Sequence, residues 1–147
     1  KMLGYLRCAK EAYPHMEAKG WGRIVNIDGL ATRQAAGVSG GMRNAAVMNA
    51  TKVLSEELGP KGITVNAVHP GATKTEALAP RLAGQMERTG KTLEEVEAGM
   101  AATLAIRRLV TAPDIANVVA FLCSEQAAAV TGESVSAAGG GSKAVFY

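Results

Sequence analysis

Three side chains in this sequence could together perform hydrolysis. Ser39 lies at the centre of Gly37-Val-Ser-Gly-Gly41, which matches the Gly-x-Ser-x-Gly pattern of serine hydrolases. Glycines on both sides of such a serine permit a sharp turn that leaves the hydroxyl exposed. His69 could act as the general base, and Asp28 could orient its ring. The sequence therefore suggests a serine esterase or lipase that uses Ser39, His69 and Asp28.

The elements that would position these residues follow from the apolar pattern. Residues 23–28 and 63–68 are short β-branched runs typical of buried strands, and a helix is expected between them over residues 43–58. A strand–helix–strand unit of this kind pairs its strands in parallel through a right-handed crossover. Asp28 and His69 each end or follow a strand, so both are expected at the carboxyl edge of the sheet, where ligands bind in such folds.

The remaining pattern completes an α/β architecture. We expect a helix over residues 2–18, a glycine-rich loop over residues 29–41, helices that begin at Thr92-Leu-Glu-Glu95 and Thr111-Ala-Pro-Asp114, and a last strand over residues 133–137. The prediction is a single domain over residues 1–147 with an incomplete doubly wound, Rossmann-like parallel sheet of about three strands flanked by helices.

Two observations weigh against the hydrolase interpretation. A glycine-rich loop produces the pentapeptide readily by chance, and the hydrolase turn needs a strand directly before it. Residues 33–37 have a poor strand pattern. The other histidine, His15, stands beside Pro14 at the end of a helix and is not a competing base. Other functions therefore stay open.

Several motifs, in order along the chain, resemble the C-terminal half of the short-chain dehydrogenase/reductase family. Gly22-Arg-Ile-Val-Asn-Ile27 is similar to the fifth strand of that family, and Val65-Asn-Ala-Val-His-Pro-Gly71 is similar to its sixth strand and the turn that follows. Arg108-Leu-Val-Thr-Ala-Pro-Asp-Ile-Ala116 and Phe121-Leu-Cys-Ser124 resemble the helix before the last strand, and Val130-Thr-Gly-Glu133 resembles that strand. The resemblance implies a Rossmann-like fold and an oxidoreductase.

The resemblance also implies that the catalytic groups of the family are replaced. The positions of its tyrosine, lysine and serine fall on Gly40 or Met42, on Asn44 and on Gly29, and its active-site asparagine falls on Lys1. Removal of a general acid typically costs about 10²–10⁴ in rate. The family binds NAD(P), but the glycine-rich turn that holds the pyrophosphate belongs to a first half that this chain does not match. No cofactor is therefore expected for this chain alone.

Three functions follow. The first is a divergent short-chain dehydrogenase/reductase-like protein with little or no redox activity as this chain, in which Pro70, Gly71 and Thr75 are vestiges of the nicotinamide site that the resemblance implies. The second is the serine esterase or lipase, and the third is a non-catalytic interaction module. A small carbonyl or ester compound is the expected substrate of the first two.

Composition and charge exclude several other classes. The 147 residues are 48% apolar, and the net charge of +3 is spread without a basic block, so neither nucleic acid nor membrane is expected as a partner. Cysteine and histidine are not clustered at metal-ligand spacing, so no metal is expected. Cys8 and Cys123 fall in apolar helical patterns, as buried reduced thiols do. A cytoplasmic location follows by default from the absence of a signal-peptide layout.

A homo-oligomer is expected on two grounds. Helices 2–18 and 43–58 correspond to the pair that forms the dimer interface of the resembling family. The strand over residues 23–28 would also present an apolar edge, formed by Ile24, Val25 and Ile27, which is an aggregation site unless it is covered. We expect another copy of the chain or a rearranged segment to cover it.

Overall fold

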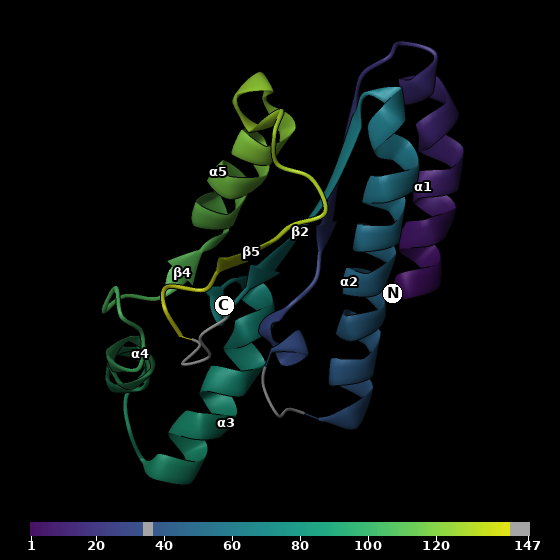
Figure 1. Cartoon of the computed structure of the whole chain (residues 1–147). Coiled ribbons are helices and arrows are strands. Elements are labelled where there is room, and N and C mark those ends of the chain that lie inside the picture. The colour runs from purple at the N-terminus through teal and green to yellow at the C-terminus, as the bar shows by residue number, and fades with distance from the viewer. Residues whose placement is uncertain (34–36, 142–147) are drawn as a thin grey trace.

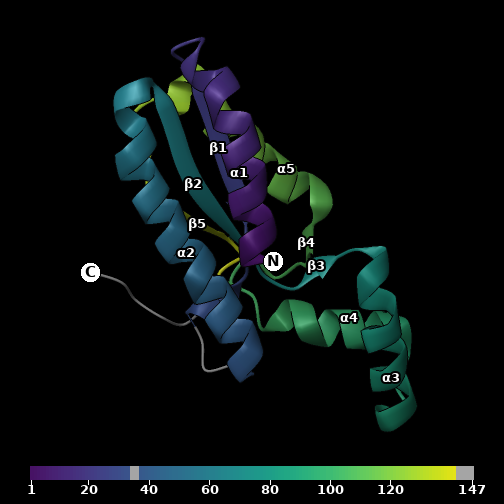
Figure 2. The same cartoon turned by 90° about the vertical axis from the view of Figure 1, so that its right-hand side faces the viewer.

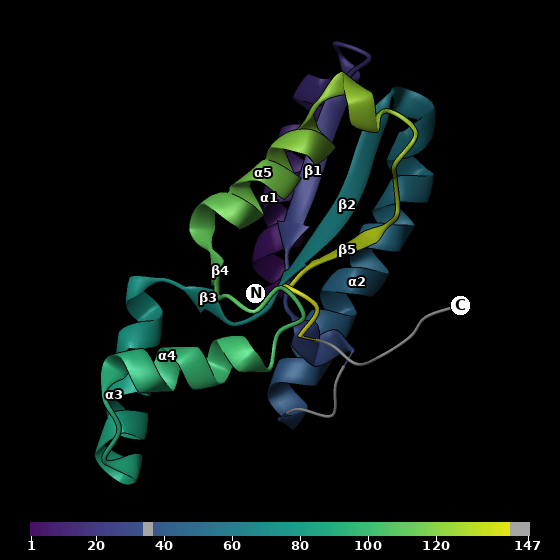
Figure 3. The same ribbon diagram turned by 90° about the vertical axis from the view of Figure 1, so that its left-hand side faces the viewer.

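The computed structural model, which describes residues 1–33 and 37–141, has a parallel sheet between two layers of helices (Figure 1). The strands of the sheet, in spatial order, are β1 (Gly22–Ile27), β2 (Ile63–Pro70) and β5 (Ser134–Ala137). Helices α1 (Met2–Glu17) and α2 (Val38–Leu58) cover one face, and α5 (Ala112–Cys123) covers the other (Figure 3). The predicted α/β fold with three parallel strands is confirmed.

Two further helices project beyond one end of the sheet (Figure 2). They are α3 (Ala79–Thr89) and α4 (Leu93–Ala102). The two-residue strands β3 (Thr73–Lys74) and β4 (Val110–Thr111) pair in parallel and fasten this projection to the start of α5. The short 3₁₀ helices are η1 (Leu30–Thr32), η2 (Gly59–Lys61), η3 (Glu76–Leu78) and η4 (Glu125–Ala127).

The central strand β2 supplies both layers of the core. All of its residues from Ile63 to His69 are buried, as expected for a parallel strand covered on both faces. Successive side chains point to opposite faces of a strand. Val65 accordingly packs in the cluster that contains Leu58, on the side of α1 and α2, whereas Val68 packs against Leu122 of α5.

The turn between α2 and β2 requires glycine at position 62. Gly62 has a φ of 76°, and a Cβ atom there would lie 2.1 Å from the carbonyl oxygen of Gly20. This close approach lets the backbone N–H of Gly22 donate to the carbonyl of Gly62 at 3.2 Å. Gly22 is therefore paired with Ile63, which fixes the register of β1 on β2 up to the end that carries the site.

Helix boundaries were predicted well where capping side chains exist and poorly elsewhere. Thr92 and Thr111 form the predicted capping boxes of α4 and α5. The expected loop up to residue 41 is wrong, because α2 begins at Val38 and the carbonyl of Gly37 accepts backbone N–H groups from its first turn. The helix that Thr92 caps ends at Ala102.

The predicted burial of the two cysteines is wrong, because both thiols are free and exposed. On α1 the buried residue is Ala9, next to Cys8, and on α5 it is Leu122, next to Cys123. An apolar helical pattern does not show which of two adjacent positions is buried. Within residues 1–33 and 37–141, none of the helices has the length and apolar character needed to cross a membrane.

Strand β1 forms one edge of the three-stranded sheet. Ile27 at its end remains 37% exposed. Coverage of this edge by another copy or segment stays a prediction.

Candidate functional site

The carboxyl ends of β1 and β2 bring Asp28 and His69 into contact. The backbone N–H of Asp28 donates to the carbonyl of Val68 at 2.9 Å, which continues the strand pairing by one residue. Oδ1 of Asp28 then lies 3.3 Å from Nδ1 of His69, and both side chains are completely buried. The same oxygen accepts the backbone N–H of Gly29. The structure therefore unites two of the three residues that the sequence suggested for a hydrolytic site.

Hydroxyl groups lie at both nitrogens of the His69 ring. Oγ1 of Thr32 is 3.5 Å from Nδ1, and Oγ of Ser134 contacts Nε2. Nη2 of Arg33 donates to Oγ of Ser134 at 2.7 Å and to the carbonyl oxygen of Ser134 at 3.1 Å. A carboxylate, an imidazole and a hydroxyl in this order have the arrangement of an acid–base relay.

Ser39, the serine suggested by the sequence, lies in a different environment. It is exposed in the first turn of α2, and its carbonyl accepts a hydrogen bond from Nε of Arg43 at 3.1 Å. The backbone N–H groups of Gly40 and Gly41 both donate to the carbonyl of Gly37. These groups are thus engaged within the helix, whereas an oxyanion site needs donors directed at the substrate. A catalytic role for Ser39 stays a prediction.

Ser134 was not among the residues predicted for the site, although strand alternation contains the necessary signal. Ala67 is paired with Ser134 and His69 with Ser136 in the parallel register of β2 and β5. Residues two apart on a strand share a face, so Ser134 and His69 are diagonal neighbours on one face of the sheet. Because β5 is short and polar, its register was not evident without the structure.

An ammonium group lies at the same end of the molecule. The chain N-terminus is close to the carboxyl ends of the strands (Figure 3). Nζ of Lys1 donates to Oδ1 of Asn44 on α2 at 2.9 Å, and Nδ2 of Asn44 donates to the carbonyl of Gly29 at 3.4 Å. Partial burial lowers the pKa of Lys1 from its usual value, although the Asp28 carboxylate opposes this shift, and the charge of Arg43 adds to it.

A phenol that was not predicted from the sequence lies nearby. The hydroxyl of Tyr5 on α1 donates to the carbonyl of Ile27 at 2.6 Å. Burial raises the pKa of Tyr5 above its usual value, and the negative charge of Asp28 raises it further. Tyr5 stands far in sequence from the position at which the resembling family has its tyrosine, so the motif gave no signal for it.

One oxygen of the buried carboxylate lacks a partner. In the described part of the chain, Oδ2 of Asp28 is a buried side-chain atom without a hydrogen bond. A buried polar atom left unsatisfied costs about 1–3 kcal/mol, and more when it is charged. This oxygen therefore lowers the stability of the site, because no donor among the described residues compensates for its burial.

The residues suggested for a nicotinamide site follow directly after β2. Pro70 is the last residue of that strand. Gly71 packs closely against the residue that follows β5, because a Cβ atom there would lie 2.9 Å from the Cβ of Ala138. Thr75 precedes η3, is exposed and makes no capping hydrogen bond to that helix. The assignment of these residues to a nicotinamide site stays a prediction.

Comparison with known proteins adds a family match over nearly the whole chain. Residues 1–142 match a family model described as enoyl-(acyl carrier protein) reductase. The NADPH-dependent reductase BacG of Bacillus subtilis (strain 168) is 32% identical over 147 residues, which cover 99% of this chain and 57% of that protein. The short-chain reductase protein NovJ of Streptomyces niveus is 35% identical over 138 residues, which cover 93% of this chain and 51% of that protein.

A solved structure agrees with these sequence matches. The crystal structure of YwfH, an NADPH-dependent reductase involved in bacilysin biosynthesis, has a TM-score of 0.90 and 32% identity, and the match covers 99% of this chain and 56% of that one. The chain thus spans about half the length of the curated relatives that it matches.

Proposed function

Because this chain belongs to the short-chain dehydrogenase/reductase family, we propose that it supplies the substrate-side half of an NADPH-dependent reductase of a small carbonyl or enoyl compound. The observation that carries the proposal is the polar cluster of Lys1, Asn44 and Asp28 at the carboxyl edge of the parallel sheet. Ligands bind at this edge in doubly wound folds. The dependence on NADPH that is stated for BacG and YwfH supports the choice of cofactor.

Reduction of a carbonyl group requires a hydride for its carbon and a proton for its oxygen. NADPH supplies the hydride when it is bound. The residues of this chain orient the substrate oxygen and provide hydrogen bonds to it. His69 and the N–H of Gly29 hold one oxygen of Asp28, so that this carboxyl group contributes a negative charge of fixed position to the site.

Saturation-transfer NMR with NADPH tests this function. Because we propose that Thr75 contacts the nicotinamide end, protons of the nicotinamide should receive more saturation from residues 1–147 than protons of the adenine. Thr75→Val removes the hydroxyl at nearly constant volume and should weaken that transfer, whereas the exposed Thr89→Val on α3 should not. Transfer that is absent, or that is greater at the adenine, contradicts the proposal.

The reaction itself is assayed in the full-length protein, since residues 1–147 alone are expected to hold NADPH weakly and to transfer little hydride. Loss of NADPH absorbance is followed with a panel of ketones, aldehydes and enoyl thioesters. Oxidation of NADPH that depends on one of these substrate classes is the expected result. A protein that is folded, binds NADPH and reduces none of them would refute the proposal.

One observation favours a second function. Ser134 contacts Nε2 of His69 while Asp28 lies at Nδ1, which is the order of groups in a serine hydrolase. We propose ester hydrolysis with Ser134 as the nucleophile as the alternative to reduction. A fluorophosphonate probe distinguishes the candidates, because Ser134→Ala should abolish labelling and Ser39→Ala should leave it intact. The reverse result would support Ser39, and an unlabelled protein would remove the hydrolase function.

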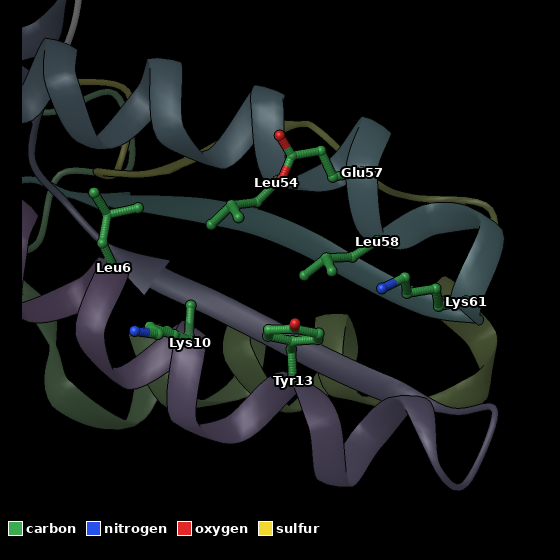
Figure 4. A pocket seen from close by; sticks show the side chains of 8 residues that line it. Leu6, Lys10, Tyr13, Leu54, Glu57, Leu58 and Lys61 are labelled. Atoms are coloured by element: carbon green, nitrogen blue, oxygen red, sulfur yellow. The ribbon is translucent and has the colours of Figure 1, made fainter.

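The face formed by α1 and α2 is proposed as the contact between copies of the chain. A hollow of about 220 Å³ lies between these helices, with Leu6, Tyr13, Leu54 and Leu58 on its apolar part (Figure 4). The Lys61 ammonium lies 5.0 Å from the centre of the Tyr13 ring at one end. Leu3 on α1 is 60% exposed. An apolar side chain from a second copy would fill the hollow and cover such residues.

A further inference from the structure

We propose that Lys1 is the acid of the reduction described above, and that Asn44 positions its ammonium group to protonate the substrate oxygen. The inference rests on the proposed reductase function and assigns a proton donor to it. The site otherwise lacks an evident acid, because the positions implied for the tyrosine hold Gly40 or Met42. Neither side chain carries an ionisable proton.

The other ionisable groups at this end of the sheet are less suited to the role. The Tyr5 hydroxyl already donates to the carbonyl of Ile27, and its raised pKa makes it a weaker acid than an ordinary tyrosine. His69 is completely buried and is contacted at both ring nitrogens. Arg33 and Arg43 carry guanidinium groups, which do not release a proton in proteins.

The surroundings of Lys1 suit a proton donor. Of the three donors of an ammonium group, one is directed to Oδ1 of Asn44 at 2.9 Å, and the residue is exposed, so a substrate can reach the others. Nζ also lies 6.0 Å from the centre of the Tyr5 ring. Asn44 is fixed in turn by its bond to the carbonyl of Gly29. Partial burial brings the pKa of Lys1 closer to neutral pH, where an acid is most effective.

The step balances with the reduced nicotinamide as the co-reactant. Lys1 loses one proton as an N–H bond of its ammonium group breaks and the O–H bond of the product forms. The electron pair of the new C–H bond on the substrate comes from the dihydronicotinamide, which is oxidised while the carbonyl compound is reduced. Lys1 is left as a neutral amine and regains its proton from water.

The first test measures the Lys1 amine directly in residues 1–147. Reductive methylation with ¹³C-formaldehyde labels the lysines, and Lys1→Arg identifies the Nζ signal of Lys1. This signal should titrate at lower pH than an ordinary lysine ammonium group, because partial burial lowers the pKa of Lys1. Asn44→Asp places a carboxylate beside the ammonium and should move its titration upward, whereas Asn49→Asp, an exposed site on the same helix, should not. Titration of Lys1 at or above the usual lysine pKa would overturn the proposal.

The second test measures the reaction in the full-length protein. Lys1→Met should lower kcat/KM by about 10²–10⁴ and should remove the alkaline limb of its pH profile, while Lys19→Met leaves both unchanged. Asn44→Asp should shift that limb to higher pH, which a purely structural role would not do. An active Lys1→Met protein overturns the role of Lys1 alone. Absence of NADPH oxidation in the unsubstituted protein overturns the reductase function and this proposal together.

Discussion

Asn66→Leu tests the hydrogen bonds that hold the segment before β5 to β2 and so place Ser134 beside His69. Asn66 is completely buried in β2, its Nδ2 donates to the carbonyl of Val130 at 2.8 Å, and its Oδ1 accepts the N–H of Glu133 at 3.1 Å. Leucine has a similar volume but leaves two backbone groups without partners, at about 1–3 kcal/mol each. Since Glu133 is exposed, water can reach part of this loop. We therefore expect the lower part of the combined range, about 2–3 kcal/mol of lost stability.

Urea unfolding followed by circular dichroism measures this loss. The midpoint should fall at an unchanged slope, because the surface exposed on unfolding stays nearly the same. Asn117→Leu makes the same change at an exposed position of α5 and should alter stability by no more than about 0.5 kcal/mol. Equal effects of the two substitutions would show that the hydrogen bonds of Asn66 do not hold this loop to β2.

Three further predictions concern the cap of α5, the core and the proposed interface. Arg108 and Thr111 hold the pKa of Asp114 well below its usual range. The ionised carboxyl group therefore stabilises the fold at pH values above the usual pKa of aspartate, and this stabilisation is lost as the pH falls. Asp114→Asn should lower the thermal midpoint near neutral pH and have less effect in acid; equal effects at both would contradict this. Leu122→Ala should cost about 2–5 kcal/mol in urea unfolding, because Leu122 is completely buried, and a smaller loss would indicate that the core closes around the cavity. Leu3→Glu should weaken self-association in sedimentation, whereas Phe121→Glu, an exposed site on α5, should not.

The fold was largely predictable because its elements depend on local patterns. The β-branched runs that became β1 and β2 and the threonines that cap α4 and α5 each carry their signal within a few residues. The meeting of Asp28 and His69 followed from one further rule, that parallel strands end at the same edge. The first turn of α2 was not predicted because its glycines favour a loop. The hydrogen bonds that the carbonyl of Gly37 accepts from this turn are evident only in the structure.

The rest of the site could not be predicted because its contacts join distant parts of the chain. Ser134 is 65 residues from His69, and Lys1 is 43 residues from Asn44. Such pairs depend on the register of a short strand and on the packing of α1 against α2, neither of which a local pattern determines. Compared position by position with the family, Lys1 and Asn44 are two unrelated replacements.

The structure gives these two replacements a common explanation, since the side chains of Lys1 and Asn44 bond to each other. If they are one exchange, the residue before α1 now supplies the ammonium group and α2 supplies the amide, so the site keeps the same two chemical groups. The double variant Lys1→Asn with Asn44→Lys reverses the exchange. Asn44→Lys alone places two ammonium groups side by side and should destabilise the protein, whereas the double variant should recover stability, with a coupling energy of about 0.5–3 kcal/mol in urea unfolding. Effects of the two substitutions that simply add would show that the pair arose without mutual dependence.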